Sequence, residues 1–150
     1  MELVEIKGNL FDENTFAGDV YVHCISSDFA MGKGIALEFC RKYPVFNYQK
    51  TALRDYYLKK PNGVFLVRID DILIANLVTK EKYFNKPTYA SLEKSLKACK
   101  NILSEQGLPV KRLIMPKIGC GLDRLEWSSV KPLIEDVFCD TDYKILVFYL

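Results

Sequence analysis

The sequence has few of the features that mark metal-binding, disulfide-bonded or membrane-spanning proteins. It contains one histidine, and its five cysteines include no CxxC pair, so neither a structural zinc site nor a disulfide framework is expected. No apolar run reaches membrane-spanning length, and charges interrupt the N-terminal MELVEIKGN, which is therefore not read as a signal peptide. We expect an intracellular protein, cytoplasmic or nuclear, with free thiols and neither a metal nor a redox cofactor.

An excess of charge of one sign is also missing. The chain has 21 basic and 19 acidic residues, a formal net charge of +2. General nucleic-acid binders and membrane-surface binders usually carry a strongly basic face, so we expect neither kind of partner. A local basic pocket for a small anion stays open. With 150 residues, 49% of them hydrophobic, and only 8 glycines and 6 prolines, the chain fits one compact domain over residues 1–150.

What the sequence does contain is a regular alternation of β-rich and helix-forming segments. The predicted strands are Leu3–Lys7, Val20–Ile25, Val64–Ile69, Ile72–Val78, Arg112–Met115 and Tyr143–Leu150. The predicted helices are Ile35–Tyr43, Phe46–Leu58, Tyr89–Gln106 and Ser128–Phe138. This order predicts an α/β sandwich with helices on both faces of a mixed sheet.

Ligands of such folds usually bind where loops leave the carboxyl ends of strands. Ser26–Gly34 connects a strand to a helix and holds Lys33 between two glycines. Glycine lets a backbone approach a ligand closely, and a helix start offers free N–H groups to an anion. Glycine spacing alone favours a simple tight turn into a helix over a phosphate site.

A second loop, Pro116–Asp123, contains Gly-Cys-Gly. Successive N–H groups in such a bend form a concavity for phosphate. With no second histidine to activate it, we interpret Cys120 as a small residue whose backbone matters rather than as a nucleophile. Asp123 is either a helix cap, an ion-pair partner of Arg124, or a catalytic group. In the third loop, Thr79–Pro87, Lys80 lies closest to the end of its strand, whereas Lys82 and Lys86 are expected to be solvated. The single histidine, His23, is expected to be a partly buried strand residue and not a base.

Several segments taken together resemble a known family. They are Lys7–Leu10, His23–Ser26, Met31–Ala36, Thr79-Lys80, Lys86–Tyr89 and Pro116–Leu125. In this order they resemble the macrodomain family, in the branch of the O-acyl-ADP-ribose deacylases, also called terminal ADP-ribose protein glycohydrolases. The resemblance extends from Leu3 to Leu150.

The resemblance implies a three-layer αβα macro domain with ADP-ribose in a cleft. It also implies an enzyme that removes ADP-ribose from glutamate and aspartate side chains and deacylates O-acyl-ADP-ribose, with Lys80 as nucleophile and Asp123 as general acid/base. ADP-ribose and ADP-ribosylated proteins would be the partners, and family analogy implies a monomer. The implied substrate-binding residues are Asn9, Leu10, Ser26, Met31, Gly32, Gly34, Thr79, Pro116, Lys117, Ile118, Gly119, Cys120, Gly121, Leu122 and Leu150.

Three positions depart from the family pattern. Asn9 stands where the family usually has an aspartate that accepts a hydrogen bond from the adenine amino group; its amide can still accept, but without charge. Lys33 replaces a small residue, and Lys117 replaces an arginine and loses its forked geometry. Two alternatives therefore stay open: a module that binds ADP-ribose without turnover, and a phosphatase acting on ADP-ribose 1″-phosphate.

Overall fold

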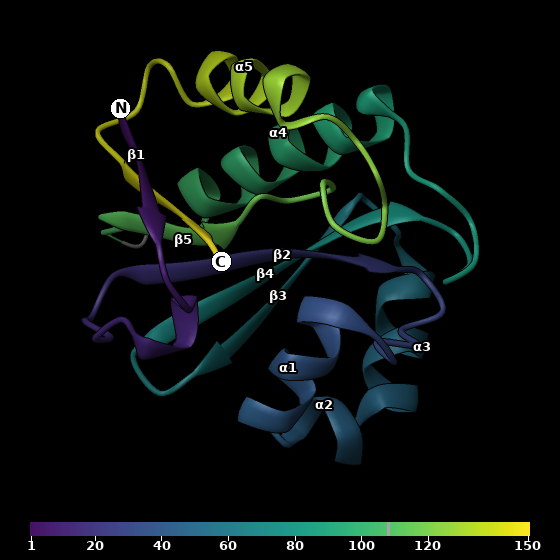
Figure 1. Cartoon of the computed structure of the whole chain (residues 1–150). Helices are drawn as coiled ribbons and strands as arrows, with labels where there is room; N and C mark the ends of the chain where they lie inside the picture. Colours follow the sequence, from purple (N-terminus) through teal and green to yellow (C-terminus); the bar gives the residue numbers. More distant parts are fainter. Residues whose placement is uncertain (108) are drawn as a thin grey trace.

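A computed structural model describes residues 1–107 and 109–150 (Figure 1). Six strands form one sheet in the order β1-β6-β5-β2-β4-β3. Neighbouring strands run parallel except β3, which pairs antiparallel with β4 at one edge. The strands are β1 (Glu2–Lys7), β2 (Asp19–Ser26), β3 (Val64–Ile69), β4 (Ile72–Lys80), β5 (Arg112–Pro116) and β6 (Lys144–Tyr149).

The helices cover both faces of the sheet, as Figure 1 shows. On one face, α1, α2 and α3 contribute Phe39, Phe46 and Tyr57 to a core with the strands. On the other, α4 and α5 contribute a second core that includes Leu96 and Ile134. The helices are η1 (Leu10–Asp12), α1 (Gly34–Lys42), α2 (Val45–Tyr48), α3 (Lys50–Lys59), α4 (Tyr89–Glu105) and α5 (Trp127–Val137). The predicted three-layer αβα sandwich around a mixed sheet is therefore confirmed. None of the described helices is long and apolar enough to cross a membrane.

Two of the predicted elements differ in the structure. The segment Phe46–Leu58, predicted as one helix, forms α2 and α3, because Gln49 adopts φ −119° and ψ 16° between them. The predicted loop Thr79–Pro87 begins two residues later than expected, since Thr79 and Lys80 still belong to β4. Hydrophobic periodicity does not reveal a single non-helical residue between two helices. It also does not reveal polar residues at the end of a strand that still pair with the neighbouring strand.

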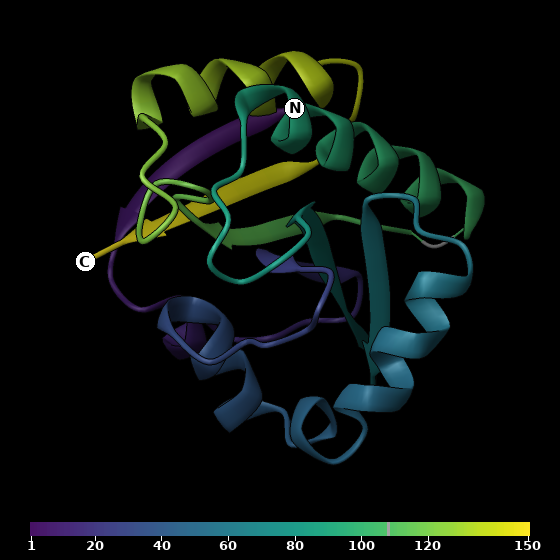
Figure 2. The same ribbon diagram turned by 90° about the vertical axis from the view of Figure 1, so that its right-hand side faces the viewer.

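The fold brings the carboxyl ends of five strands to the same edge of the sheet. Because β1, β2, β4, β5 and β6 are parallel, their carboxyl ends lie at that edge, and the loops that follow β2, β4 and β5 lie close together there (Figure 2). The pairing of β2 with β4 is irregular at this edge: Ile25 lies opposite Val78, but Ser26 lies opposite Lys80. Thr79 is thus an extra residue in β4, a bulge one residue before Lys80.

Candidate active site

A cleft of about 860 Å³ opens between the loops at the carboxyl ends of β2, β4 and β5. Its size falls within the usual range of small-molecule sites. The predicted site residues that line it are Ser26, Met31, Gly32, Gly34, Lys80, Pro116, Lys117, Ile118, Gly119, Gly121, Leu122 and Asp123. Five others are not among its lining residues: Asn9, Leu10, Thr79, Cys120 and Leu150.

The two predicted catalytic residues lie in contact inside this cleft. Lys80, the last residue of β4, donates from Nζ to Oδ1 of Asp123 over 2.7 Å. The side chains are only 14% and 16% exposed, so each charge depends largely on the other for its partner. An ammonium and a carboxylate at hydrogen-bond distance can exchange a proton directly, which is the geometry a nucleophile and its base require.

The bulge in β4 helps to place Lys80. Ser27 N–H donates to the Lys80 carbonyl over 2.9 Å, which ties this strand end to the loop after β2. Thr79 turns away into the interior, where its Oγ1 is buried and has no hydrogen-bond partner among the described residues. β-Bulges commonly re-aim a side chain beside an active site. The predicted contact of Thr79 with substrate stays a prediction.

The loop after β2 has a conformation that only its surroundings can maintain. Phe29 and Met31 have φ values of 54° and 48° and are both buried. Non-glycine residues adopt positive φ at a cost, and such residues cluster at binding sites. The Met31–Gly34 segment therefore lines the cleft in a conformation that is fixed by the buried residues of the turn before it.

Asp28 connects two walls of the cleft, and sequence reasoning did not assign it a role. Its carboxylate accepts from Ser26 Oγ, from Ala30 N–H at 3.2 Å and from Tyr83 N–H at 3.0 Å, so it joins the loops after β2 and β4. Burial by itself would raise the pKa of Asp28, but the hydrogen bonds from Ser26, Tyr83 and Ala30 outweigh it and lower that pKa. The signal in the sequence was the Ser-x-Asp spacing after a strand, which is typical of side-chain-to-backbone turns.

The loop after β5 forms the opposite wall. Gly119 has φ 72°, and Leu125 N–H bonds its carbonyl over 2.7 Å, which closes the loop on itself. Leu122 lies across the start of α1, close enough that a Cβ on Gly34 would come within 3.1 Å of it. Lys86, expected to be solvated, is exposed but donates to the Leu122 carbonyl over 2.8 Å and lines the cleft. The loops after β4 and β5 are thus tied together beside the Lys80–Asp123 pair.

Two thiols lie beside the site and are not built to be nucleophiles. Burial raises the pKa of Cys24 to about 12, and the negative charge of Asp123 adds to the shift. Burial raises the pKa of Cys120 to about 11. A reactive cysteine needs a lowered pKa, so the interpretation of Cys120 as a small residue is consistent with the structure. Within residues 1–107 and 109–150, no group of three or more His, Cys, Asp or Glu side chains could hold a metal ion.

The remaining predicted residues lie around the far end of the sheet edge. Asn9 caps η1, accepting from Phe11 N–H at 2.9 Å; Leu10 is buried in the core; and Leu150 is 94% exposed. The Lys117 ammonium lies 4.7 Å from the centre of the Tyr149 ring and 3.8 Å from a Glu5 carboxylate oxygen. Lys117 thus lines the cleft while its ammonium interacts with Tyr149 and Glu5 outside it.

His23 was expected to be partly buried and is in fact completely buried. Its Nε2 bonds Oδ1 of Asn76 over 2.6 Å, and its ring stacks on Phe39 at 4.0 Å between ring centres. Burial lowers the pKa of His23 to about 4, and the hydrogen bond to Asn76 only partly offsets this. A neutral, enclosed imidazole is a structural group, in agreement with the expectation that His23 is not a base.

The chain has close relatives in sequence and in structure. It is 42% identical over 149 residues to the human ADP-ribose glycohydrolase OARD1, with 97% of this chain and 90% of that protein covered, and equally to the bovine protein. The macrodomain of Thermus aquaticus DarG has the same fold, with a TM-score of 0.82, 23% identity and coverage of 99% of this chain and 98% of that one. Thermosipho africanus DarTG in complex with ADP-ribose has a TM-score of 0.81 and 20% identity, over 98% of this chain and 41% of that one.

No family model matches the sequence. The relationship rests instead on the identity to the glycohydrolases over nearly the whole chain, together with the fold shared with solved macrodomains. The chain therefore belongs to the macrodomain family, in the group that includes ADP-ribose glycohydrolase OARD1.

Proposed function

We propose that this protein is an ADP-ribose-binding hydrolase that releases ADP-ribose from glutamate and aspartate side chains and deacylates O-acyl-ADP-ribose. The observation that carries the proposal is the Lys80–Asp123 contact of 2.7 Å inside a cleft walled by glycine-bearing loops. The name of the relative that is 42% identical, ADP-ribose glycohydrolase, supports the same reaction class.

The cleft offers the groups that an ADP-ribose pyrophosphate requires. Met31–Gly34 leads into the N-terminus of α1, and the loop from Lys117 to Leu122 bends around Gly119 on the opposite side. Backbone N–H groups in such bends and at helix starts bind phosphate oxygens, and the charge of Lys33 adds attraction. A pyrophosphate held between these loops would leave the distal ribose beside Lys80.

The chemistry then begins with a proton transfer. Lys80 gives a proton to Asp123 along their hydrogen bond and becomes a neutral amine. The amine attacks the anomeric carbon of the distal ribose, the bond from that carbon to the acyl oxygen breaks, and the acceptor carboxylate leaves with the electron pair. A covalent adduct of this kind replaces one difficult step by two easier ones.

Water completes the reaction. It attacks the same carbon, the carbon–nitrogen bond breaks with its electrons returning to the amine, and the amine takes up the proton of the water. Asp123 gives its proton to solvent. The sum is hydrolysis of the ester, with release of one proton, which balances the reaction.

The test is the release of ADP-ribose from a protein mono-ADP-ribosylated on glutamate, with ADP-ribose binding measured by calorimetry. The variants are Lys80→Ala and Asp123→Ala, and Lys97→Ala is the matched control because that lysine lies exposed on α4. We expect release to fall by at least about 10²-fold in both cleft variants, the usual scale of acid–base catalysis, with binding retained.

Each other outcome changes the assignment. Binding without release by the wild type would make the protein a reader of ADP-ribose. Release that survives Lys80→Ala but not Asp123→Ala would replace the lysine adduct by an activated water. Equal release by all variants would place the reaction elsewhere.

A further inference from the structure

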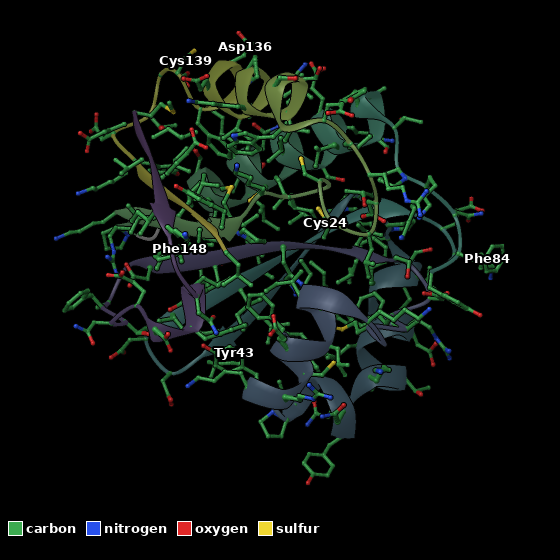
Figure 3. The ribbon with its side chains drawn as sticks, viewed as in Figure 1. Cys24, Tyr43, Phe84, Asp136, Cys139 and Phe148 are labelled. Carbon is green, nitrogen blue, oxygen red and sulfur yellow. The ribbon has the colours of Figure 1, made fainter. Side chains whose placement is uncertain are left out.

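A tight turn beyond Lys80 presents two aromatic rings to solvent at the mouth of the cleft. Asn85 N–H bonds the Lys82 carbonyl over 2.9 Å, and Asn85 Oδ1 accepts from Lys82 N–H over 2.9 Å, which closes the turn 82–85 from both sides. Tyr83 and Phe84 are its two central residues and are 62% and 68% exposed. Phe84 projects into solvent at the edge of the molecule (Figure 3).

This exposure is not explained by the fold. Tips of turns normally carry Gly, Pro, Asn, Asp or Ser, whose backbones or short side chains suit them. Here the hydrogen bond from Tyr83 N–H to Asp28 anchors the backbone of the turn, and both rings are exposed. Their centres lie 5.4 Å apart. Leu122, 60% exposed, lines the same mouth from the loop after β5.

The turn is also close to the reacting group. Only two residues separate Lys80 from Tyr83, so their Cα atoms lie at most about 11 Å apart. Tyr83, Phe84 and Leu122 line the cleft that contains the Lys80–Asp123 pair. If the anomeric carbon of the distal ribose lies beside Lys80, the acceptor attached to that carbon must pass over these side chains on its way out.

The charges around the apolar side chains are predominantly positive. Lys82 precedes the rings, Lys86 follows them, and Arg124 lines the cleft from the opposite loop. The acidic neighbours are Glu81 in the turn segment and Asp28, whose carboxylate accepts from Tyr83 N–H, whereas the Asp123 carboxylate is paired with Lys80. This rim therefore combines an apolar centre with a cationic border.

We propose that the rim formed by residues 82–86, Leu122 and Arg124 binds the polypeptide on either side of the ADP-ribosylated residue, and that it selects acceptor segments rich in acidic residues. The proposal rests on the proposed function, because it takes the substrate to be an ADP-ribosylated protein. Tyr83, Phe84 and Leu122 contact apolar parts of the segment, and Lys82, Lys86 and Arg124 attract its carboxylates.

A peptide fits the rim better than a single-stranded nucleic acid. Nucleic-acid platforms stack successive bases on ring faces and follow the backbone with a continuous basic groove. The rings of Tyr83 and Phe84 are perpendicular to one another, at 87°, so they offer no shared stacking face. The net charge of +2 also leaves little for phosphate neutralisation beyond the rim.

The experiment compares three peptides of equal length, each ADP-ribosylated on one central glutamate, with acidic, neutral or basic flanks. Affinity is measured at low salt with the Asp123→Ala variant, so the result does not depend on turnover. The same affinities are then measured after adding Tyr83→Ser with Phe84→Ser, or Lys82→Gln with Arg124→Gln. Free ADP-ribose and an ADP-ribosylated single-stranded oligonucleotide are the reference ligands.

We expect the acidic peptide to bind at least about tenfold more tightly than the basic one, and this preference to shrink several-fold at high salt. The aromatic pair of substitutions should lower the affinity for all three peptides relative to free ADP-ribose, and the basic pair should remove the preference. Equal affinity for the three peptides would overturn the proposal, as would tighter binding of the oligonucleotide. Failure of the proposed function looks different: the wild type would release no ADP-ribose, whatever the flank preference.

Discussion

Removing the Asp123 carboxylate should cost both activity and stability, because it leaves the Lys80 ammonium without a partner in a mostly enclosed place. A hydrogen bond to a charged group contributes about 1.5–3 kcal/mol, and deleting one partner of a fully buried pair costs about 3–5 kcal/mol. At 14% and 16% exposure, both side chains keep some contact with water, so we expect Asp123→Ala to cost about 1–3 kcal/mol. For a domain of this size, that lowers Tm by about 3–10 °C.

Urea unfolding followed by fluorescence measures the loss, and two variants calibrate it. Asp123→Asn keeps an oxygen that can accept from Lys80, so it should cost less stability than Asp123→Ala while still abolishing release of ADP-ribose. Lys97→Ala breaks a pair on α4 whose lysine is 60% exposed, and it should leave the urea midpoint almost unchanged, because solvent screens such a pair. If Asp123→Ala unfolds at the same urea concentration as Lys97→Ala, the pair does not stabilise the site. Release at the wild-type rate by Asp123→Asn would refute the proton transfer.

Three further changes test other parts of the structure. The pKa of His23 is about 4 in the fold and 6.5 in a free histidine, so between these pH values the imidazole is protonated in the unfolded chain but not in the folded one. The free energy of unfolding should therefore fall by up to about 3 kcal/mol from pH 6.5 to pH 4. His23→Gln should flatten that part of a plot of urea midpoint against pH. Gly119→Ala places a Cβ 3.0 Å from a neighbouring side chain at φ 72°, and should weaken ADP-ribose binding in calorimetry, whereas Gly121→Ala meets nothing within 4 Å and should not. Asn9→Asp restores a charged acceptor and should tighten ADP-ribose binding several-fold in the same assay; no gain would mean that Asn9 does not reach the adenine.

The layers of the fold follow from local pattern, and the site does not. β2 and β4 read as buried strands in the sequence because both of their faces are apolar, and the structure buries nearly every residue of both. The loops at their carboxyl ends were therefore expected at one edge. Sequence pattern could place Lys80 and Asp123 on neighbouring loops, but their contact joins residues 43 apart and depends on tertiary structure.

Two details near Lys80 had no local signal. The bulge at Thr79 depends on how β2 aligns with β4, and register is a property of the pair rather than of either strand. Lys86 reads as a solvated charge in sequence and remains exposed, yet its ammonium bonds a carbonyl from a loop 36 residues away. A long flexible side chain can reach such a partner without any change in the hydrophobic pattern.

Most of the non-glycine residues with positive φ in the described chain lie in the loops around the cleft. Of the four described non-glycine residues with positive φ, Phe29, Met31 and Arg124 lie in the loops around the cleft, and Asp70 lies in the turn between β3 and β4. The buried hydroxyl of Thr79 has no partner among the described residues. Each such feature costs on the order of 1–3 kcal/mol. The loop after β2 cannot relax, because the Phe29 side chain is completely buried and Asp28 is bonded to the neighbouring loop. The N–H groups of this loop are therefore oriented before a ligand binds, and binding does not lose entropy by ordering them.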